Sequence, residues 1–301
     1  MAPDRVIGVD VGGTKILAGT VARDGSIGRT IEVPTPTEGQ EPFLAELAST
    51  VEGLLEEGAD AIGLGVPMNL DRETGIAYHA VNLPLESLDL AGHLRTRFSL
   101  PVGIENDGNA MALAEWRLGA GRDAKNLIAL GLGTGVGGGI VIDDSLYRGW
   151  AELGHIVVEA DGPPCQGNCH GRGHLEGFVT GEAAERVAEG LWGEGADARR
   201  LVAEALAGNG AARAETDRIG HYLGVAIGSL ANIFAPELVV VGGGFGIAAW
   251  ELLHDAALAA ARREALEPAD ETLRIVPAEL GDDAGLVGAG LVAFEALDGV
   301  R

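Results

Sequence analysis

Two cysteines and several histidines fall close together in the stretch from Glu152 to Glu176 (ELGHIVVEADGPPCQGNCHGRGHLE). Thiolate sulfur and imidazole nitrogen are ligands that zinc prefers, and four such ligands close its coordination sphere. The stretch therefore predicts a structural zinc site without an open position, formed by His155, Cys165, Cys169 and His174. The ion would order a Gly-rich loop that has few other means of holding one conformation. With zinc bound, the loop would hold Glu152 and Glu176, one acid at each end, in fixed positions.

Other interpretations of these residues stay open. The cysteines would be free thiols in a surface loop, or Cys165 and Cys169 would form a disulfide, which requires an oxidising compartment. Two cysteines in a chain of 301 residues instead fit a reducing cytoplasm, which favours zinc. His170 is a rival to His174 as the fourth ligand.

Glycine-rich turns follow three apolar runs that are typical of buried strands. Consecutive N–H groups in such turns can face an anion, as they do in phosphate-binding loops. The Walker A spacing is absent, and each turn alone is also typical of an ordinary hairpin or strand-to-helix connection. The runs and their turns are Val6–Val11 with Gly12-Gly13-Thr14-Lys15, Leu127–Ile142 with Gly133-Thr134-Gly135, and Leu238–Val241 with Gly242-Gly243-Gly244.

The first two of these segments share one design. Each has an apolar strand, a glycine turn, a second strand and a closing turn, at Asp24-Gly25 and at Asp143-Asp144, and they begin about 120 residues apart. This repeat predicts two related domains whose hairpins hold a polyphosphate between them. Asp10 has no counterpart in the second copy, so this one carboxylate would bind the metal ion.

The elements around the hairpins must position a further acid, Asp107. Strands are expected at Ala61–Val66 and Val102–Glu105, and Asn106-Asp107 follow the second of them. Polar groups just past the carboxyl ends of strands are the usual place for ligand chemistry in open α/β sheets. A helix N-cap is the alternative role for Asp107. Helices are expected at 43–55, from 108 onward, and at 180–190, 198–207, 214–234, 248–266 and 283–297, with a strand at 273–276.

Composition excludes some classes of partner. The formal net charge of −24 argues against nucleic acid, whose phosphates need a basic surface. There is no apolar run long enough to span a bilayer and no secretory segment, which together with the cysteines predicts a cytoplasmic protein without a membrane partner.

Taken together, these motifs resemble the ROK (repressor, open reading frame, kinase) family, and within it the glucokinase-type sugar kinases. The resemblance covers essentially the whole chain and rests on Asp10–Lys15 (DVGGTK), Glu105–Asp107 (END), Glu152–His155 (ELGH) and the cysteine loop. It implies an α/β, actin-like fold of two ribonuclease-H-like domains with a cleft between them. The first domain would span 1–117, completed by the C-terminal helix 284–299, and the second would span 118–283 and carry the zinc loop.

The resemblance also implies phosphorylation of the 6-hydroxyl of a hexose by MgATP. Asp107 would be the catalytic base, and Asp10 would organise Mg²⁺. Sugar contacts would come from Asn82, Asn106, Asp107, Glu152, His155 and Glu176, with His155 binding zinc as well. ATP would contact Gly12, Gly13, Thr14, Lys15, Gly133, Thr134, Gly135, Gly242, Gly243 and Gly244.

Two departures from the family pattern bear on these expectations. The family usually offers three cysteines, C-x-C-G-x-x-G-C, whereas His174 stands here at the third thiolate position. In the sugar-side loop, Met68-Asn69-Leu70 replaces the commoner glycine after Gly65-Val66-Pro67, which leaves the sugar open.

Glucose is the first expectation for the substrate, and fructose, mannose, N-acetylmannosamine and allose are alternatives. A sugar-binding regulator without catalysis and an actin-like ATPase are further alternatives. A repressor would need a DNA-binding segment ahead of the first hairpin, where few residues precede Val6. Family habit implies a homo-oligomer, a dimer or a tetramer.

Overall fold

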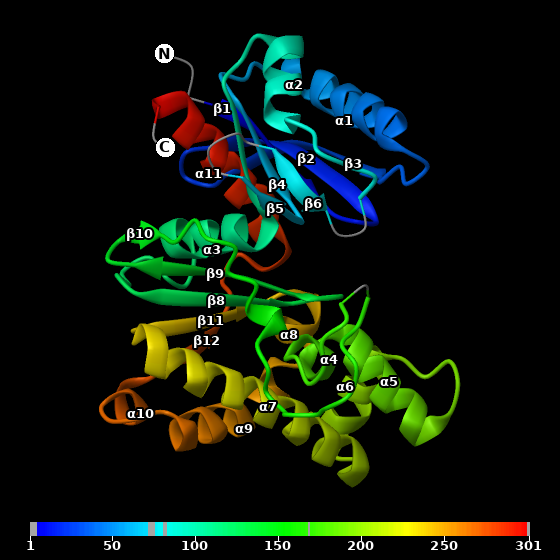
Figure 1. Cartoon of the computed structure of the whole chain (residues 1–301), viewed down its shortest axis with the longest axis vertical. Coiled ribbons are helices and arrows are strands. Elements are labelled where there is room, and N and C mark those ends of the chain that lie inside the picture. The colour runs from blue at the N-terminus through cyan, green and yellow to red at the C-terminus, as the bar shows by residue number, and fades with distance from the viewer. Residues whose placement is uncertain (1–4, 72–75, 81–82, 168, 300–301) are drawn as a thin grey trace. The chain divides into compact units, whose positions relative to one another are not determined.

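The computed structural model describes residues 5–71, 76–80, 83–167 and 169–299 (Figure 1). Contacts divide the chain into two units. Unit 1 contains Met1–Leu118, Arg148–Trp150 and Asp283–Arg301, and unit 2 contains Gly119–Tyr147 and Ala151–Asp282. No helix in the described part of the chain is long and apolar enough to cross a membrane.

The main sheet of unit 1 has five strands in the order β3-β2-β1-β4-β7. The first three strands are antiparallel, and the last two run parallel to β1. The order follows from the hairpin predicted at Gly12-Gly13 and from helical crossovers between the parallel strands. The strands are β1 (Arg5–Val11), β2 (Lys15–Ala22), β3 (Ile27–Pro34), β4 (Ile62–Val66) and β7 (Val102–Asn106), and a separate pair is formed by β5 (Met68–Leu70) and β6 (Ala77–Ala80).

Strand β1 is buried because both faces of this sheet are covered. Ile7, Val9 and Val11 belong to a core shared with α1 (Gln40–Leu55) and α2 (Leu90–Phe98). Alternate residues of a strand point to opposite faces, so Val6, Gly8 and Asp10 face the other side. There α11 (Ala284–Asp298), red in Figure 1, packs on β1 and β4 and against α3 (Asp107–Leu118).

Helix α11 is rich in glycine and alanine because it approaches the sheet closely. A Cβ atom at Gly63 of β4 would lie 1.9 Å from the carbonyl oxygen of Ala289, and one at Gly8 would lie 2.6 Å from that of Leu286. The helix can therefore lie on the sheet only where both strands lack side chains.

The sheet of unit 2 repeats this topology. Its order is β10-β9-β8-β11-β12, again with three antiparallel strands followed by two parallel ones. The duplication predicted from the two glycine turns is confirmed. The strands are β8 (Leu127–Leu132), β9 (Val136–Ile142), β10 (Ser145–Leu146), β11 (Leu238–Gly242) and β12 (Ile275–Pro277).

The helices of unit 2 follow the cysteine loop and then the parallel strands. The long helix α7 begins at Gly210, before the predicted start at 214, because the Asn209 side chain caps it by accepting from the N–H groups of Ala211 and Ala212. The predicted helix at 248–266 is confirmed as one helix over Trp250–Glu264, and a short helix over Gly244–Ala248, which was not predicted, precedes it. The helices are α4 (Glu176–Val179), α5 (Gly181–Trp192), α6 (Ala198–Leu206), α7 (Gly210–Phe234), α8 (Gly244–Ala248), α9 (Trp250–Glu264) and α10 (Ala269–Thr272).

Candidate active site

Three neighbouring strands of unit 1 bring acidic residues to one edge of the sheet. In register, Asp10 of β1 lies beside Gly65 of β4, which lies beside Glu105 of β7. These strands are parallel, so all three positions are at the carboxyl edge, where ligands bind in such sheets. Asp107 follows directly after β7 as the first residue of α3. The structure thus brings together two residues, Asp10 and Asp107, that are far apart in the sequence.

The turn that carries Asp107 is held by its neighbours. The Asn106 side chain, and not that of Asp107, caps α3, because Asn106 Oδ1 accepts from the Asn109 N–H at 3.2 Å. Asp107 Oδ1 accepts from the N–H of the next residue, Gly108, at 2.8 Å. This bond orients the carboxylate, and Asp107 stays half-buried, so its role is not that of the helix cap.

Both acids are poorly solvated. Burial first, and then the charge of Asp107, raise the pKa of Asp10 to about 6, while Lys15 acts to lower it. Burial also raises the pKa of Asp107, partly offset by hydrogen bonds from the backbone N–H groups of Gly108 and of Asp107 itself. Two neighbouring carboxylates with raised pKa values form a site that a divalent cation or a proton-donating ligand would stabilise.

The first glycine turn closes the β1–β2 hairpin beside these acids. The Gly12 N–H donates to the Lys15 carbonyl at 2.9 Å, and the Thr35 hydroxyl donates to the Gly12 carbonyl at 2.7 Å. Lys15 forms an exposed ion pair with Glu32, with Nζ 2.7 Å from Oε2. Such exposed pairs are weak, so a phosphate can compete for this lysine.

Two side chains of the cysteine loop (residues 165–176) contact the second glycine turn, Gly133-Thr134-Gly135. Glu176 Oε2 accepts from the Val136 N–H at 2.9 Å, and a Cβ atom at Gly135 would lie 2.7 Å from that same oxygen. Gln166 Nε2 donates to the Thr134 carbonyl at 2.6 Å. Glu176 therefore supports the second glycine turn as well as ending the loop. Gln166 is a further support, for which no sequence motif provides a signal.

The third turn, Gly242-Gly243-Gly244, connects β11 to α8. Gly243 has a φ of +79°, and a Cβ atom there would lie 2.5 Å from the Leu132 carbonyl oxygen, so only glycine fits. A Cβ atom at Gly244 would meet nothing within 4 Å. The turn is thus a strand-to-helix connection with open space at Gly244.

The four predicted zinc ligands come together. One ligand atom from each of His155, Cys165, Cys169 and His174 lies within 4.8 Å of all the others. Cys165 Sγ is 3.8 Å from His155 Nδ1, and Cys169 Sγ is 3.4 Å from His174 Nδ1. Around a tetrahedral zinc, such atoms would be roughly 3.5 Å apart, so a small contraction would complete the cage. The two cysteines are not joined by a disulfide.

Local structure explains why His174 joins this group. A Cβ atom at Gly171 would lie 2.1 Å from His174 Cε1, so the chain passes directly beside the imidazole ring. The Val157–His174 bridge ties the end of the loop back to its beginning. His170, the rival ligand, is exposed and is not a member of the group.

Two predicted sugar contacts remain to be placed. Glu152 is exposed and precedes the short 3-10 helix Leu153–His155, and its carbonyl oxygen accepts from the N–H of His155 at 3.0 Å. Asn82 lies outside the described residues.

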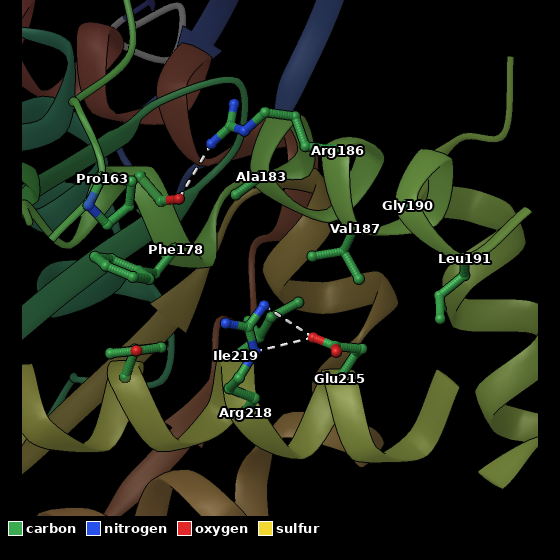
Figure 2. A pocket seen from close by; sticks show the side chains of 12 residues that line it. Pro163, Phe178, Ala183, Arg186, Val187, Gly190, Leu191, Glu215, Arg218 and Ile219 are labelled. Carbon is green, nitrogen blue, oxygen red and sulfur yellow. Dashed lines mark hydrogen bonds and ion pairs between the residues drawn. The ribbon is translucent and has the colours of Figure 1, made fainter. Parts of the chain in front are cut away.

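A separate cavity of about 440 Å³ lies in unit 2 among α4, α5 and α7 (Figure 2). Phe178 and Ile219 form part of its apolar lining, and none of the predicted site residues in the described part of the chain lines it. Its two arginines are engaged, Arg186 with the Gly177 carbonyl at 3.1 Å and Arg218 with Glu215 at 2.9 Å. The predicted catalytic and ligand-binding residues of the described part of the chain therefore lie elsewhere.

Two sheets of one topology, each with a glycine turn in its first hairpin, define the actin-like fold of sugar kinases. Solved structures agree. The chain has a TM-score of 0.83 and 33% identity to a ROK family glucokinase from Streptomyces griseus, crystallised with glucose and AMPPNP, covering 97% of this chain and 99% of that one. A ROK hexokinase from Thermus thermophilus is equally similar, with a TM-score of 0.83, 34% identity, and coverage of 98% and 99%.

Sequence comparison gives the family. The ROK family model matches residues 6–296. A glucokinase from Thermotoga maritima is 36% identical over 98% of this chain and 99% of its own length. The chain belongs to the ROK family, which confirms the resemblance seen in its motifs.

Proposed function

We propose that this protein is a hexose kinase that transfers the γ-phosphoryl group of ATP to the 6-hydroxyl of glucose. The observation that carries the proposal is the pair Asp10 and Asp107 at the carboxyl edge of the unit 1 sheet, beside the Gly12-Gly13 turn. The relatives named above, with glucose and an ATP analogue bound in one of them, support glucose and ATP as the substrates.

Asp107 is the proposed general base. Its carboxylate is oriented by the Gly108 N–H and stays half-buried, so a sugar hydroxyl can reach it. Burial raises its pKa toward the operating pH, which improves a general base. Phosphoryl transfer has a loose transition state, so orientation of the hydroxyl matters more than the strength of the base.

Asp10 is the proposed metal-organising residue. Carboxylate oxygen is a ligand that Mg²⁺ prefers, and a cation would relieve the desolvation and the repulsion from Asp107 that raise the pKa of Asp10. Mg²⁺ bound with ATP would supply charge neutralisation on the phosphates. The turns at Gly12–Lys15 and Gly133–Gly135, together with Gly242–Gly244, are proposed to contact the nucleotide.

The Cys₂His₂ group is proposed to hold a structural zinc ion. Its donor set suits zinc, and all four positions are taken by protein, which is typical of structural sites. The ion would hold His155 and, through the loop, Glu176. These two residues, with Glu152, Asn106 and Asn82, are the proposed sugar contacts, since carboxylates accept hydrogen bonds from sugar hydroxyls.

A hexose panel tests the proposal. Purified protein is mixed with ATP, Mg²⁺ and one sugar at a time (glucose, mannose, fructose, N-acetylmannosamine or allose), and ADP release is measured by a coupled assay. We expect the highest kcat/KM with glucose, with glucose 6-phosphate as product. ADP release that is the same with and without sugar would indicate an ATPase, and no release with any hexose would refute the kinase.

Two further expectations stay predictions. A homo-oligomer is tested by light scattering of the purified protein. A cytoplasmic location is tested by fractionation of the source cells.

A further inference from the structure

A short segment interrupts unit 2. Arg148–Trp150 has its contacts in unit 1, although the residues before and after it belong to unit 2. It follows β10 and comes just before Glu152. None of the sequence motifs assigns this segment a role.

Arg148 connects two elements of unit 1 by its guanidinium. Nη1 donates to Glu105 Oε2 at 2.7 Å, and Nη2 donates to Glu295 Oε2 on α11. The side chain of Glu105 is 0% exposed, whereas those of Arg148 and Glu295 are 29% and 23% exposed. One planar guanidinium thus spans a wholly buried acid and a partly buried one, a geometry that suits arginine and not lysine.

The second oxygen of Glu105 holds the turn around Asp107. Glu105 Oε1 accepts from the Asn106 N–H at 2.9 Å and from Asn109 Nδ2 at 3.1 Å. Asn106 in turn caps α3 through the Asn109 N–H. The residues on both sides of Asp107 are therefore fixed by one carboxylate, and that carboxylate is fixed by Arg148.

Loss of the Arg148 guanidinium would disturb this arrangement. Glu105 would keep its hydrogen bonds from Asn106 and Asn109 but would lose its counterion. A buried carboxylate without a neutralising cation is costly, so it either takes up a proton or moves toward water. Either change alters the acceptor on which the Asn106 N–H and the Asn109 side chain depend. The orientation of the following residue, Asp107, would then be less well defined.

We propose that Arg148 is a positioning residue, which holds Glu105 and thereby the turn that presents Asp107 to the substrate hydroxyl. The inference rests on the proposed function in so far as Asp107 is the base. Arg148 would not touch the reacting atoms, so it would affect the rate only through the orientation of the Asp107 carboxylate. Small misplacements of a reacting group cost up to about 100-fold in rate.

The test compares Arg148→Met, Arg148→Lys and the control Arg23→Met. Arg23 also pairs with an acid of α11, Asp298, at 2.8 and 2.9 Å, but that pair is exposed and holds no part of the Asp107 turn. Steady-state kinetics with glucose and MgATP are measured at a temperature where each variant is fully folded. Hydrogen exchange is followed in parallel in a peptide covering Val102–Leu113.

We expect Arg148→Met to lower kcat by about 10- to 100-fold, with the KM for ATP changed less than about threefold. Arg148→Lys should recover part of kcat, and Arg23→Met should resemble the wild type. Exchange at Asn106–Asn109 should be faster in Arg148→Met alone. A kcat within about twofold of the wild type, or unchanged exchange in this turn, would overturn the proposal.

Two outcomes require a further measurement: a variant that does not fold, and a wild-type protein that phosphorylates no hexose. If Arg148→Met does not fold, the double variant Glu105→Gln with Arg148→Met removes the wholly buried carboxylate charge together with its guanidinium, and leaves only the partly exposed Glu295 without that partner. Its kcat should stay at least about tenfold low although its melting temperature recovers, and a recovery of both would indicate a purely structural ion pair. If the wild type phosphorylates no hexose, the proposed function fails, while the exchange measurement still decides whether Arg148 orders Asn106–Asn109.

Discussion

Replacement of Asp10 by asparagine should stabilise the metal-free protein while it impairs the enzyme. Asp10 has a pKa of about 6 in the folded chain, against 3.8 for an ordinary aspartate, chiefly because of burial and then because of Asp107. At about 1.36 kcal/mol per pKa unit, the ionised carboxylate costs about 3 kcal/mol of folding free energy at pH 7.5. The neutral asparagine side chain would carry no charge and would avoid most of this cost.

The size of the thermal shift follows from the length of the chain. Unfolding entropy is about 2.1 cal/mol/K per residue, so a stabilisation of about 3 kcal/mol raises the melting temperature by about 5 °C if all 301 residues unfold together. The shift would be roughly 10 °C if unit 1 unfolds alone, because it contains about half of the chain.

The pH dependence has a definite sign. A folded pKa above the unfolded one means that the contribution of Asp10 to stability is complete below about pH 4 and is lost as the pH rises through about 6. The advantage of Asp10→Asn should therefore shrink to about half at pH 5 compared with pH 7.5. Bound MgATP should stabilise the wild type more than the variant.

Differential scanning calorimetry in magnesium-free buffer at pH 5 and pH 7.5 measures this. Asp24→Asn is the control, since Asp24 is exposed and its pKa is lowered by hydrogen bonds from Ser26, so its replacement should give no gain at pH 7.5. A melting temperature of Asp10→Asn at pH 7.5 that is equal to or below that of the wild type would show that the ionised Asp10 carboxylate does not destabilise the folded chain. A gain that does not depend on pH would lead to the same conclusion.

Three further predictions concern packing, zinc and sugar. Gly63→Ala should lower the free energy of unfolding, measured by urea unfolding, by at least about 3 kcal/mol, because its Cβ would lie 1.9 Å from a backbone oxygen of α11. In the control Gly190→Ala, the added Cβ would meet no atom within 4 Å, so the free energy of unfolding should rise by up to about 1 kcal/mol. Cys169→Ser should reduce zinc, measured by mass spectrometry, from one ion per chain to well below one, and retention of a full equivalent would exclude the cage. Glu176→Gln keeps an acceptor for the Val136 N–H but removes the negative charge. The KM for glucose should therefore rise about tenfold or more, while the KM for ATP changes little. The reverse pattern would assign Glu176 to the second glycine turn alone.

The parts of the fold that can be predicted are those where local chemistry and burial agree. The hairpin β1–β2 and its repeat β8–β9 are apolar runs broken by glycine, so their pairing is evident from sequence. Strand β3 escapes prediction because it is an edge strand in which most residues are exposed and none is fully buried. Helix α2 (LAGHLRTRF) escapes it because only Leu90, Ala91 and Leu94 of it are buried, too few for a clear period.

The candidate site is predictable residue by residue but not as an arrangement. Asp107 follows a strand, and Cys165 and Cys169 stand in a glycine-rich loop, which are local signals. The pairing of Arg148 with Glu105 joins residues 43 positions apart and follows no periodicity. One signal for it is available, since a glutamate inside an apolar strand needs a partner wherever the chain can supply one.

In the proposed reaction, the Asp107 carboxylate accepts the proton of a glucose hydroxyl during phosphoryl transfer from ATP. This role is tested by steady-state kinetics of Asp107→Asn, with glucose binding measured on the same sample by calorimetry. We predict that kcat falls by about 10²- to 10⁴-fold while glucose still binds and the melting temperature does not fall. A variant that phosphorylates glucose at the rate of the wild type would contradict this role for Asp107.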